Sequence, residues 1–178
     1  LVKEDGQIIQ GNRPINPAAF AIHSSIHKAR PDVNSAAHAH SVFGRTFSSL
    51  GKLLDPITQD AALFFQEQAI YDSYGGVAFD IEEGLAIAEA LGEKRTAILQ
   101  NHGLLTTGTS VDIAIWLFIA MDKCCQSQLL ADSAGSPIII SDEIALQAKA
   151  QAGTDMILWA SFQPLYDLIY AMEPNFLK

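Results

Sequence analysis

Ala37-His38-Ala39-His40-Ser41 is the stretch on which the fold prediction rests, because it places two histidines one residue apart. On an extended strand, residues i and i+2 point to the same face, so both imidazoles can reach one point in space. The small residues that precede the histidines favour a strand that is packed closely by its neighbours. We therefore expect a strand over residues 33–40 with His38 and His40 on one face.

A third histidine, His102, directly follows the strand-like run 96–99, within Gln100-Asn101-His102-Gly103-Leu104. Three neutral imidazoles that converge at strand ends suit a catalytic zinc or a similar metal with one coordination position left open. The sequence therefore predicts a metal centre made of His38, His40 and His102.

Two further histidines form a second candidate pair on a predicted helix. Asn16 is a good helix N-cap and Pro17 suits the first helical position, so a helix is expected to begin there and to end before Pro31. His23 and His27 are four residues apart and share one face of it. No third ligand lies near them in sequence, so a polar helix face or hydrogen-bonded structural histidines is the favoured interpretation.

The remaining pattern mixes strands with helices but does not alternate strictly. Apolar periodicity and capping residues predict helices near 81–91, 111–134 and from 142 onward, and short strands at 53–54, 69–71, 96–100 and 104–107. Ser41, Asp80 and Ser110 are the expected N-caps. This pattern favours a layered α/β domain with a mixed, mainly antiparallel sheet.

The length and composition indicate one globular domain over residues 1–178, with 135–178 as a partly helical tail interrupted by Pro164. Hydrophobic residues make up 49% of the chain and charged residues 17%. The run 1–9 is typical of a hairpin, and a hairpin at the start exposes a sheet edge. We therefore expect the N-terminal part of the domain to be missing from this sequence.

The formal net charge of -9 argues against a nucleic-acid or anionic-membrane partner, since the 11 Lys and Arg residues are scattered. The sequence contains no run of 18 apolar residues, so no membrane span is predicted. The adjacent residues Cys124 and Cys125 do not suit a disulfide, and they lie in a helical pattern. Reduced thiols fit a reducing compartment, so a cytoplasmic location is expected.

Three motifs together are similar to those of a known family. Arg30-Pro31-Asp32-Val33, His38-Ala39-His40-Ser41 and Asn101-His102-Gly103-Leu104 resemble the class II aldolase and adducin-like family, which includes fuculose-phosphate aldolases and ribulose-phosphate epimerases. The resemblance covers roughly residues 1–134. It implies a three-layer α/β/α fold and a divalent metal on the three histidines, with Zn²⁺ as the expected ion. It also implies a small-molecule carbonyl substrate and a homo-oligomer, by resemblance a tetramer.

The sequence departs from the family pattern at three places. The acid/base carboxylate of the family falls at Ala19, which can neither transfer protons nor bind a metal. The proton-donating tyrosine of the fuculose-type aldolases falls at Gln59. The Gly-Asn-x-Ser region that helps to hold a sugar phosphate is absent from these residues. The retro-aldol machinery of the well-known members therefore does not carry over whole.

Other segments resemble a fungal and actinobacterial subgroup of aldolase-like proteins. They are Asn12-Arg13-Pro14-Ile15-Asn16, Thr58-Gln59-Asp60-Ala61 and the region Cys124-Cys125-Gln126. The subgroup includes aldolase-like proteins of aminocoumarin antibiotic biosynthesis, which are described as non-haem iron oxygenases. The resemblance therefore adds Fe²⁺ as the alternative metal.

Three functions follow as expectations. The first is a metal-dependent carbon–carbon lyase in which Asp60 replaces the lost carboxylate in proton transfer; a helix-capping role is the competing interpretation of Asp60, and Glu67 and Tyr71 are weaker candidates. The second is an Fe(II)-dependent oxygenase or decarboxylase at the same histidines. The third is a non-catalytic, adducin-like interaction domain, which has no need of converging imidazoles.

Overall fold

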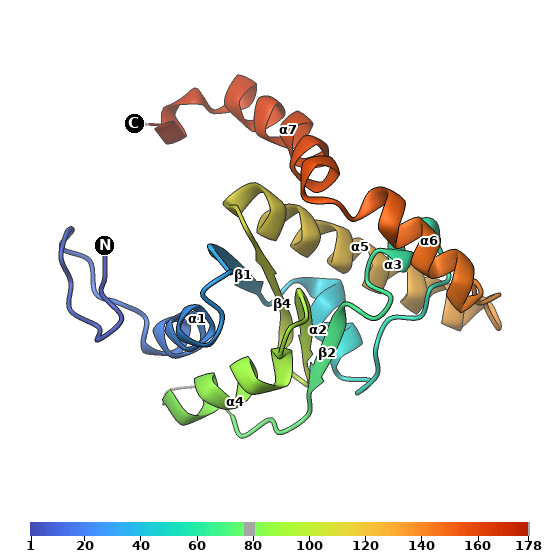
Figure 1. Ribbon diagram of the computed structural model, residues 1–178, viewed down its shortest axis with the longest axis horizontal. Coiled ribbons are helices and arrows are strands. Elements are labelled where there is room, and N and C mark those ends of the chain that lie inside the picture. Colours follow the sequence, from blue (N-terminus) through green and yellow to red (C-terminus); the bar gives the residue numbers. More distant parts are fainter. Residues whose placement is uncertain (77–80, 178) are drawn as a thin grey trace.

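A four-stranded sheet with helices on both faces forms the centre of the computed structural model, which describes residues 1–76 and 81–177 (Figure 1). The strands lie in the order β1-β4-β3-β2. β4 pairs antiparallel with both β1 and β3, and β2 pairs parallel with β3. The predicted three-layer fold with a mixed, mainly antiparallel sheet is confirmed. The strands are β1 Ser35–Ala39, β2 Gln68–Tyr71, β3 Thr96–Leu99 and β4 Gly103–Gly108.

Helices α1 (Pro17–Ala29) and α4 (Ile81–Leu91) pack together on one face of the sheet. Their apolar residues form one core cluster with the strands, which includes Ile22, Ile87 and Leu105. The two helices cross closely at Gly84, where an added Cβ would lie 2.1 Å from the main-chain oxygen of Ala21. As the sequence predicts, Asn16 caps α1: its Oδ1 accepts hydrogen bonds from the N–H groups of the first turn.

The opposite face carries α2 (Val42–Ser48), α3 (Gln59–Ala62) and α5 (Val111–Ala134). A second core cluster lies between these helices and the sheet and includes Phe47, Ile98, Leu104, Leu117 and Met121. Ser110 caps α5 as predicted. Two clusters on opposite faces bury the sheet on both sides, and this burial holds the ends of the strands in place.

Helix α5 is 24 residues long, and in the described part of the chain it is the one helix long and apolar enough, by those criteria alone, to cross a membrane. It packs against β4, β1 and α2 along its length. A core helix meets the same criteria, and the contacts of α5 are those of a core helix. Cys124 and Cys125 lie buried in α5 as free thiols, as the sequence predicts.

The predicted cap of the helix after His40 is wrong in its detail. Ser41 occupies the N-cap position of α2, but its side chain makes no capping bond. The carboxylate of Asp122, on α5, instead accepts a hydrogen bond from the Gly44 N–H at 2.9 Å. A residue 78 positions away thus performs the role expected of a local serine. The predicted cap at Asp80 lies outside the described residues.

The strand predicted at residues 53–54 is also wrong. Leu54 is buried in an irregular segment, and the side chain of Gln68 satisfies its main chain. The Leu54 N–H donates to Oε1 of Gln68 at 2.9 Å, and Nε2 of Gln68 donates to the Leu54 oxygen at 2.7 Å. One side-chain amide thus replaces a strand partner, because buried peptide groups require hydrogen bonds from some source.

The C-terminal segment forms α6 (Asp142–Ala152), α7 (Asp155–Met172) and the short 3-10 helix η1 (Pro174–Leu177). The predicted interruption at Pro164 is wrong, because α7 continues through this exposed residue. Helix α7 packs against α5 through its first half, where Leu158 is buried. Large apolar side chains of α7 remain exposed, among them Met156, Trp159, Leu168, Ile169, Tyr170 and Met172.

Candidate metal centre

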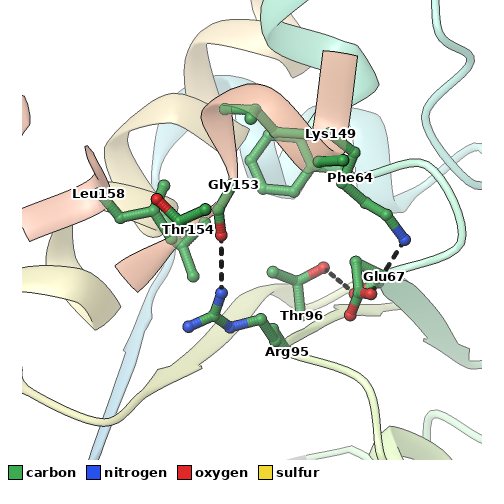
Figure 2. Close-up of a pocket in the computed structure, with 11 residues that line it drawn as sticks. Phe64, Glu67, Arg95, Thr96, Lys149, Gly153, Thr154 and Leu158 are labelled. Carbon is green, nitrogen blue, oxygen red and sulfur yellow. Dashed lines mark hydrogen bonds and ion pairs between the residues drawn. The ribbon is translucent and has the colours of Figure 1, made fainter. Parts of the chain in front are cut away.

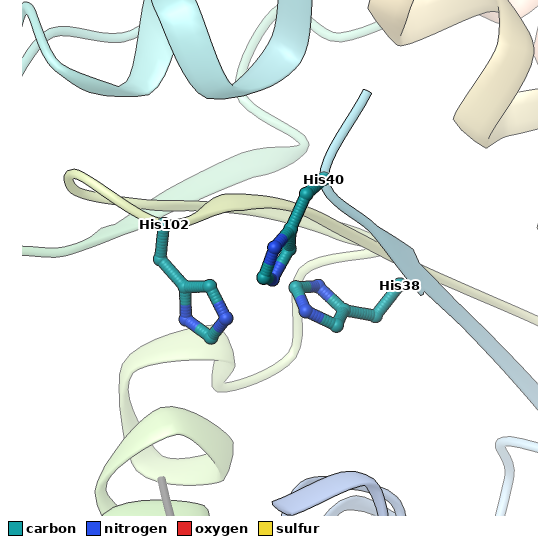
Figure 3. A group of neighbouring side chains, drawn as sticks. All are labelled: His38, His40 and His102. Atoms are coloured by element: carbon teal, nitrogen blue, oxygen red, sulfur yellow. The ribbon is translucent and has the colours of Figure 1, made fainter. Parts of the chain in front are cut away.

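Two strands and one turn bring the three predicted histidines together. His38 lies in β1, His40 follows its last residue, and His102 lies in the turn between β3 and β4. The central position of β4, between β1 and β3, places the turn beside the end of β1. Figure 3 shows the three side chains projecting to one side of the sheet, the side on which α1 and α4 run.

The turn that carries His102 has a backbone that its sequence suits. Leu99 pairs with Gly103 across the turn, and the His102 N–H donates to the Leu99 oxygen at 3.0 Å. Asn101 adopts the left-handed conformation with φ of 58°, which asparagine tolerates better than most residues. The short turn therefore fixes where the His102 side chain leaves the backbone.

Gly103 allows the two strands to approach each other beneath the histidine rings. A Cβ at this position would lie 2.9 Å from the Ala39 oxygen. It would also lie 3.6 Å from ring carbons of both His38 and His40. The glycine that follows His102 is therefore a requirement of the close packing under the centre.

The three imidazoles surround a common point. One ligand atom from each of His38, His40 and His102 lies within 4.8 Å of the other two. The ring centroids are 4.7 to 5.2 Å apart, and the ring planes are inclined by 74° to 75°. Imidazoles bind zinc at roughly 2.0–2.1 Å, and three rings grouped around one point are the arrangement that such a site requires.

A main-chain contact sets the orientation of His38. Its Nδ1 lies 2.8 Å from the main-chain oxygen of Leu104, which can only accept a hydrogen bond. Nδ1 therefore carries the proton, and the lone pair is on Nε2, the atom left free to bind a metal. This pattern, in which the second ring nitrogen donates to a carbonyl, is the usual support of a metal-binding histidine.

Burial keeps two of the rings in the neutral form that ligation requires. Desolvation lowers the pKa of His38 to about 4, against the opposing effect of the Leu104 hydrogen bond, and the charges of the neighbouring histidines lower it further. Desolvation and then His40 lower the pKa of His102 as well. A donor set of three imidazole nitrogens fits a divalent ion such as Zn²⁺ or Fe²⁺.

The structure does not bring Asp60 to these histidines within one chain. Asp60 lies in the first turn of α3, where the Thr58 side chain, and not Asp60, caps the helix. Helix α3 packs against α5 and α6, on the face of the sheet opposite the histidines. Asp60 lies near Cys124, whose pKa is raised to about 12 by burial and then by the Asp60 charge.

The other residues considered for proton transfer are Glu67 and Tyr71, together with Gln59 and Ala19 at the two family positions. Glu67 forms an ion pair with Lys149 at 3.1 Å, and Tyr71 is buried at the end of β2. Gln59 shares helix α3 with Asp60. Ala19 is exposed on α1, one helical turn before His23.

The second histidine pair divides into two different environments. Nδ1 of His27 lies 3.0 Å from the Val33 oxygen, so this ring ties α1 to the segment before β1. His23 instead shares a cavity with His38, and the other lining residues are Ala36, Ala37, Ala39, Ile115 and Phe118. Neither residue belongs to the three-histidine group found among the described residues.

Tyr74 is a neighbour of the centre that the sequence did not single out. Its ring centroid lies 6.2 Å from that of His102, and the residue is 46% exposed. Tyr74 lies in the loop after β2, and β2 runs parallel to β3, so both strands end at the same edge of the sheet. The loop Tyr74-Gly75-Gly76 was the available signal, since its position after a strand next to the His102 turn is what brings it here.

A separate cavity of about 210 Å³ lies away from the histidines, under α6 and the start of α7 (Figure 2). Its charged residues already have partners. Lys149 is paired with Glu67, and Arg95 donates to the Gly153 oxygen at 3.2 Å and binds Asp155. These contacts attach the C-terminal helices to the sheet, so we assign the cavity no chemical role.

Comparison with known proteins agrees with this geometry. The family model described as Class II Aldolase and Adducin N-terminal domain matches residues 1–129. The solved structure titled L-fuculose 1-phosphate aldolase from Glaciozyma antarctica PI12 is 39% identical, with a TM-score of 0.89. The match covers 97% of this chain and 68% of that one.

Two Streptomyces proteins are each 41% identical to this chain, in alignments that cover 98% of it. One is Decarboxylase NovR from Streptomyces niveus. The other, from Streptomyces roseochromogenus subsp. oscitans, is named 4-hydroxy-3-prenylphenylpyruvate oxygenase/4-hydroxy-3-prenylbenzoate synthase. The chain spans 66% and 64% of their lengths, just under two thirds of these relatives.

Proposed function

The chain belongs to the class II aldolase and adducin family, and from this premise we propose that it is a metal-dependent enzyme. It breaks a carbon–carbon bond next to the carbonyl group of a small molecule. The single observation that carries this proposal is the convergence of His38, His40 and His102, whose ligand atoms lie within 4.8 Å of one another. A purely structural domain of the adducin kind gains nothing from three imidazoles that meet at one point.

A divalent ion bound at these histidines would polarise the substrate carbonyl, and Fe²⁺ would in addition support reaction with O₂. The protein's own part is to present three nitrogens in fixed orientations. The hydrogen bond from His38 to the Leu104 oxygen holds one ring, and the β3–β4 turn holds another. His40, which is exposed, leaves the centre open to a substrate.

Oxidative decarboxylation of a 2-oxo acid is the reaction that we favour. The family carboxylate is replaced by Ala19, so proton transfer of the aldolase type lacks its usual group. Of the described residues that line the cavity beside His38, none is a lysine or arginine that could hold a phosphate. The two Streptomyces relatives are named as a decarboxylase and an oxygenase acting on a phenylpyruvate.

Aldol-type cleavage with Zn²⁺ is the second candidate. It is supported by the 39% identity to the structure titled L-fuculose 1-phosphate aldolase and by the shared fold.

In either case we propose a homo-oligomer, a tetramer by family resemblance, because α7 exposes Trp159, Tyr170 and other large apolar side chains. The free, buried thiols of Cys124 and Cys125 support a cytoplasmic location.

The two reactions are separated by metal analysis and two assays. Protein purified anaerobically without added metal is analysed for zinc and iron and then reloaded with each ion. The Fe²⁺ form is mixed with 4-hydroxyphenylpyruvate, and O₂ uptake and CO₂ release are measured. The Zn²⁺ form is mixed with fuculose 1-phosphate, and aldehyde release is measured. Coupled O₂ uptake and CO₂ release supports the favoured reaction; aldehyde release alone supports the lyase.

A further inference from the structure

His23 is the polar side chain that shares the cavity beside the metal centre with His38. The cavity has a volume of about 240 Å³, and apart from the two histidines its lining is alanine, isoleucine and phenylalanine. His23 lies close enough to His38 for its charge to act on that ring. A half-buried imidazole in an otherwise apolar wall is costly to desolvate unless a hydrogen bond compensates.

The contacts of His23 differ from those of its neighbour on the same helix face. Nδ1 of His27 is engaged by the Val33 oxygen at 3.0 Å, so that ring has a structural role. Within residues 1–76 and 81–177, no hydrogen bond engages the ring of His23, and the three-histidine group does not include it. The ring of His23 therefore offers one nitrogen that donates and one that accepts, and neither has a hydrogen-bond partner among the described residues.

We propose that His23 is a substrate-binding residue that hydrogen-bonds an oxygen of the substrate held at the three-histidine centre. This inference rests on the proposed function. It assigns to α1 the polar contact that Ala19, one turn earlier on the same helix, is unable to make. The apolar lining around His23 receives the carbon skeleton of the substrate, which suits an aryl 2-oxo acid better than a sugar phosphate.

The test uses Co²⁺-loaded protein and azide, a small anion that binds metals and accepts hydrogen bonds. Azide is titrated into the wild type and into His23→Phe, His23→Gln and His27→Gln, and the visible Co²⁺ spectrum is followed. His23→Phe keeps the bulk of the ring but removes its hydrogen bond, and we expect azide affinity to fall about tenfold. His23→Gln, which retains an N–H donor, is expected to recover part of this loss, and His27→Gln to bind azide like the wild type.

Cobalt affinity is measured in parallel, and it is expected to stay within about twofold of the wild type in all His23 variants, because His23 is not a ligand. Unchanged azide affinity in His23→Phe overturns the proposal. A parallel loss of Co²⁺ affinity also overturns it, since His23 would then bind the metal itself. Circular dichroism confirms that each variant is folded. If His23→Phe weakens azide binding but the wild type releases neither CO₂ nor aldehyde, the proposed reaction is wrong and the binding role of His23 is still supported.

Discussion

The imidazole Nδ1 of His38 lies 2.8 Å from the main-chain oxygen of Leu104, a residue 66 positions later in the chain. The same two segments pair as strands β1 and β4, in which Ala39 lies opposite Leu104. The strand pairing therefore also orients one of the three candidate metal ligands. Substitutions that disturb the pairing of β1 and β4 are expected to weaken metal binding. Substitutions of the histidines alone are expected to leave the sheet intact.

Removal of His102 tests the centre without disturbing the core. His102 lies in a turn and is only partly buried, so His102→Ala is expected to change the free energy of unfolding of the metal-free protein by less than about 1 kcal/mol. Metal affinity is expected to fall at least about 100-fold, because a direct ligand is lost. Isothermal titration with Zn²⁺ and chemical unfolding measure the two effects. His27→Ala is the matched control and should bind metal normally; retention of metal by His102→Ala would contradict the assignment.

The low pKa of His38 predicts how the metal-free protein responds to acid. The ring has a pKa of about 4 when folded and about 6.5 when unfolded, so between these values the unfolded chain binds the extra proton. Stability is therefore full above about pH 6.5 and is lost as the pH falls toward 4, by up to about 3 kcal/mol from this group. Urea unfolding across this range measures the slope, and His38→Gln should flatten it. An equal slope in His38→Gln would show that other groups cause the acid sensitivity.

Gly103→Ala probes the close approach of β1 and β4. The new Cβ would lie 2.9 Å from the Ala39 oxygen, so one of the two strands must shift. The expected cost is about 1–3 kcal/mol in the free energy of unfolding, with weaker metal binding because a shift of either strand changes the spacing of the three histidines. Gly75→Ala is the control, since a Cβ there meets nothing within 4 Å. Thermal unfolding and metal titration are measured for both variants. Equal stability and equal metal affinity of the two variants would mean that a Cβ fits between β1 and β4.

Gln68→Leu tests whether one side chain replaces a strand partner for Leu54. The change leaves the N–H and C=O of Leu54 without their hydrogen bonds in a buried setting. Each unsatisfied group costs about 1–3 kcal/mol, so we expect a total loss of about 2–6 kcal/mol. Chemical unfolding measures the loss, with the exposed residue Gln10 changed to Leu as the control. A loss below about 1 kcal/mol would indicate that this segment finds other partners.

Local rules explain why much of this protein is predictable from its sequence. The period of two along a strand places His38 and His40 on one face, and the structure agrees. Asn16 and Ser110 are helix caps whose effect extends only three residues, so neighbouring residues suffice to predict them. Convergence of His102 on the same point follows from its place in the turn between β3 and β4, once β4 pairs with β1.

The surroundings of the three histidines could be seen only in the tertiary structure, because they depend on which segments pack side by side. The strand order brings Tyr74 toward the histidines, and the packing of α1 and α3 on opposite faces of the sheet places His23 near them and Asp60 away from them. The same long-range packing lets Asp122 cap α2 and Gln68 pair with Leu54. The sequence by itself thus predicted the three histidines as candidate ligands, because His38 and His40 follow the period of a strand and His102 directly follows a strand. The surroundings of the centre were decided by contacts between distant segments, which no local periodicity encodes.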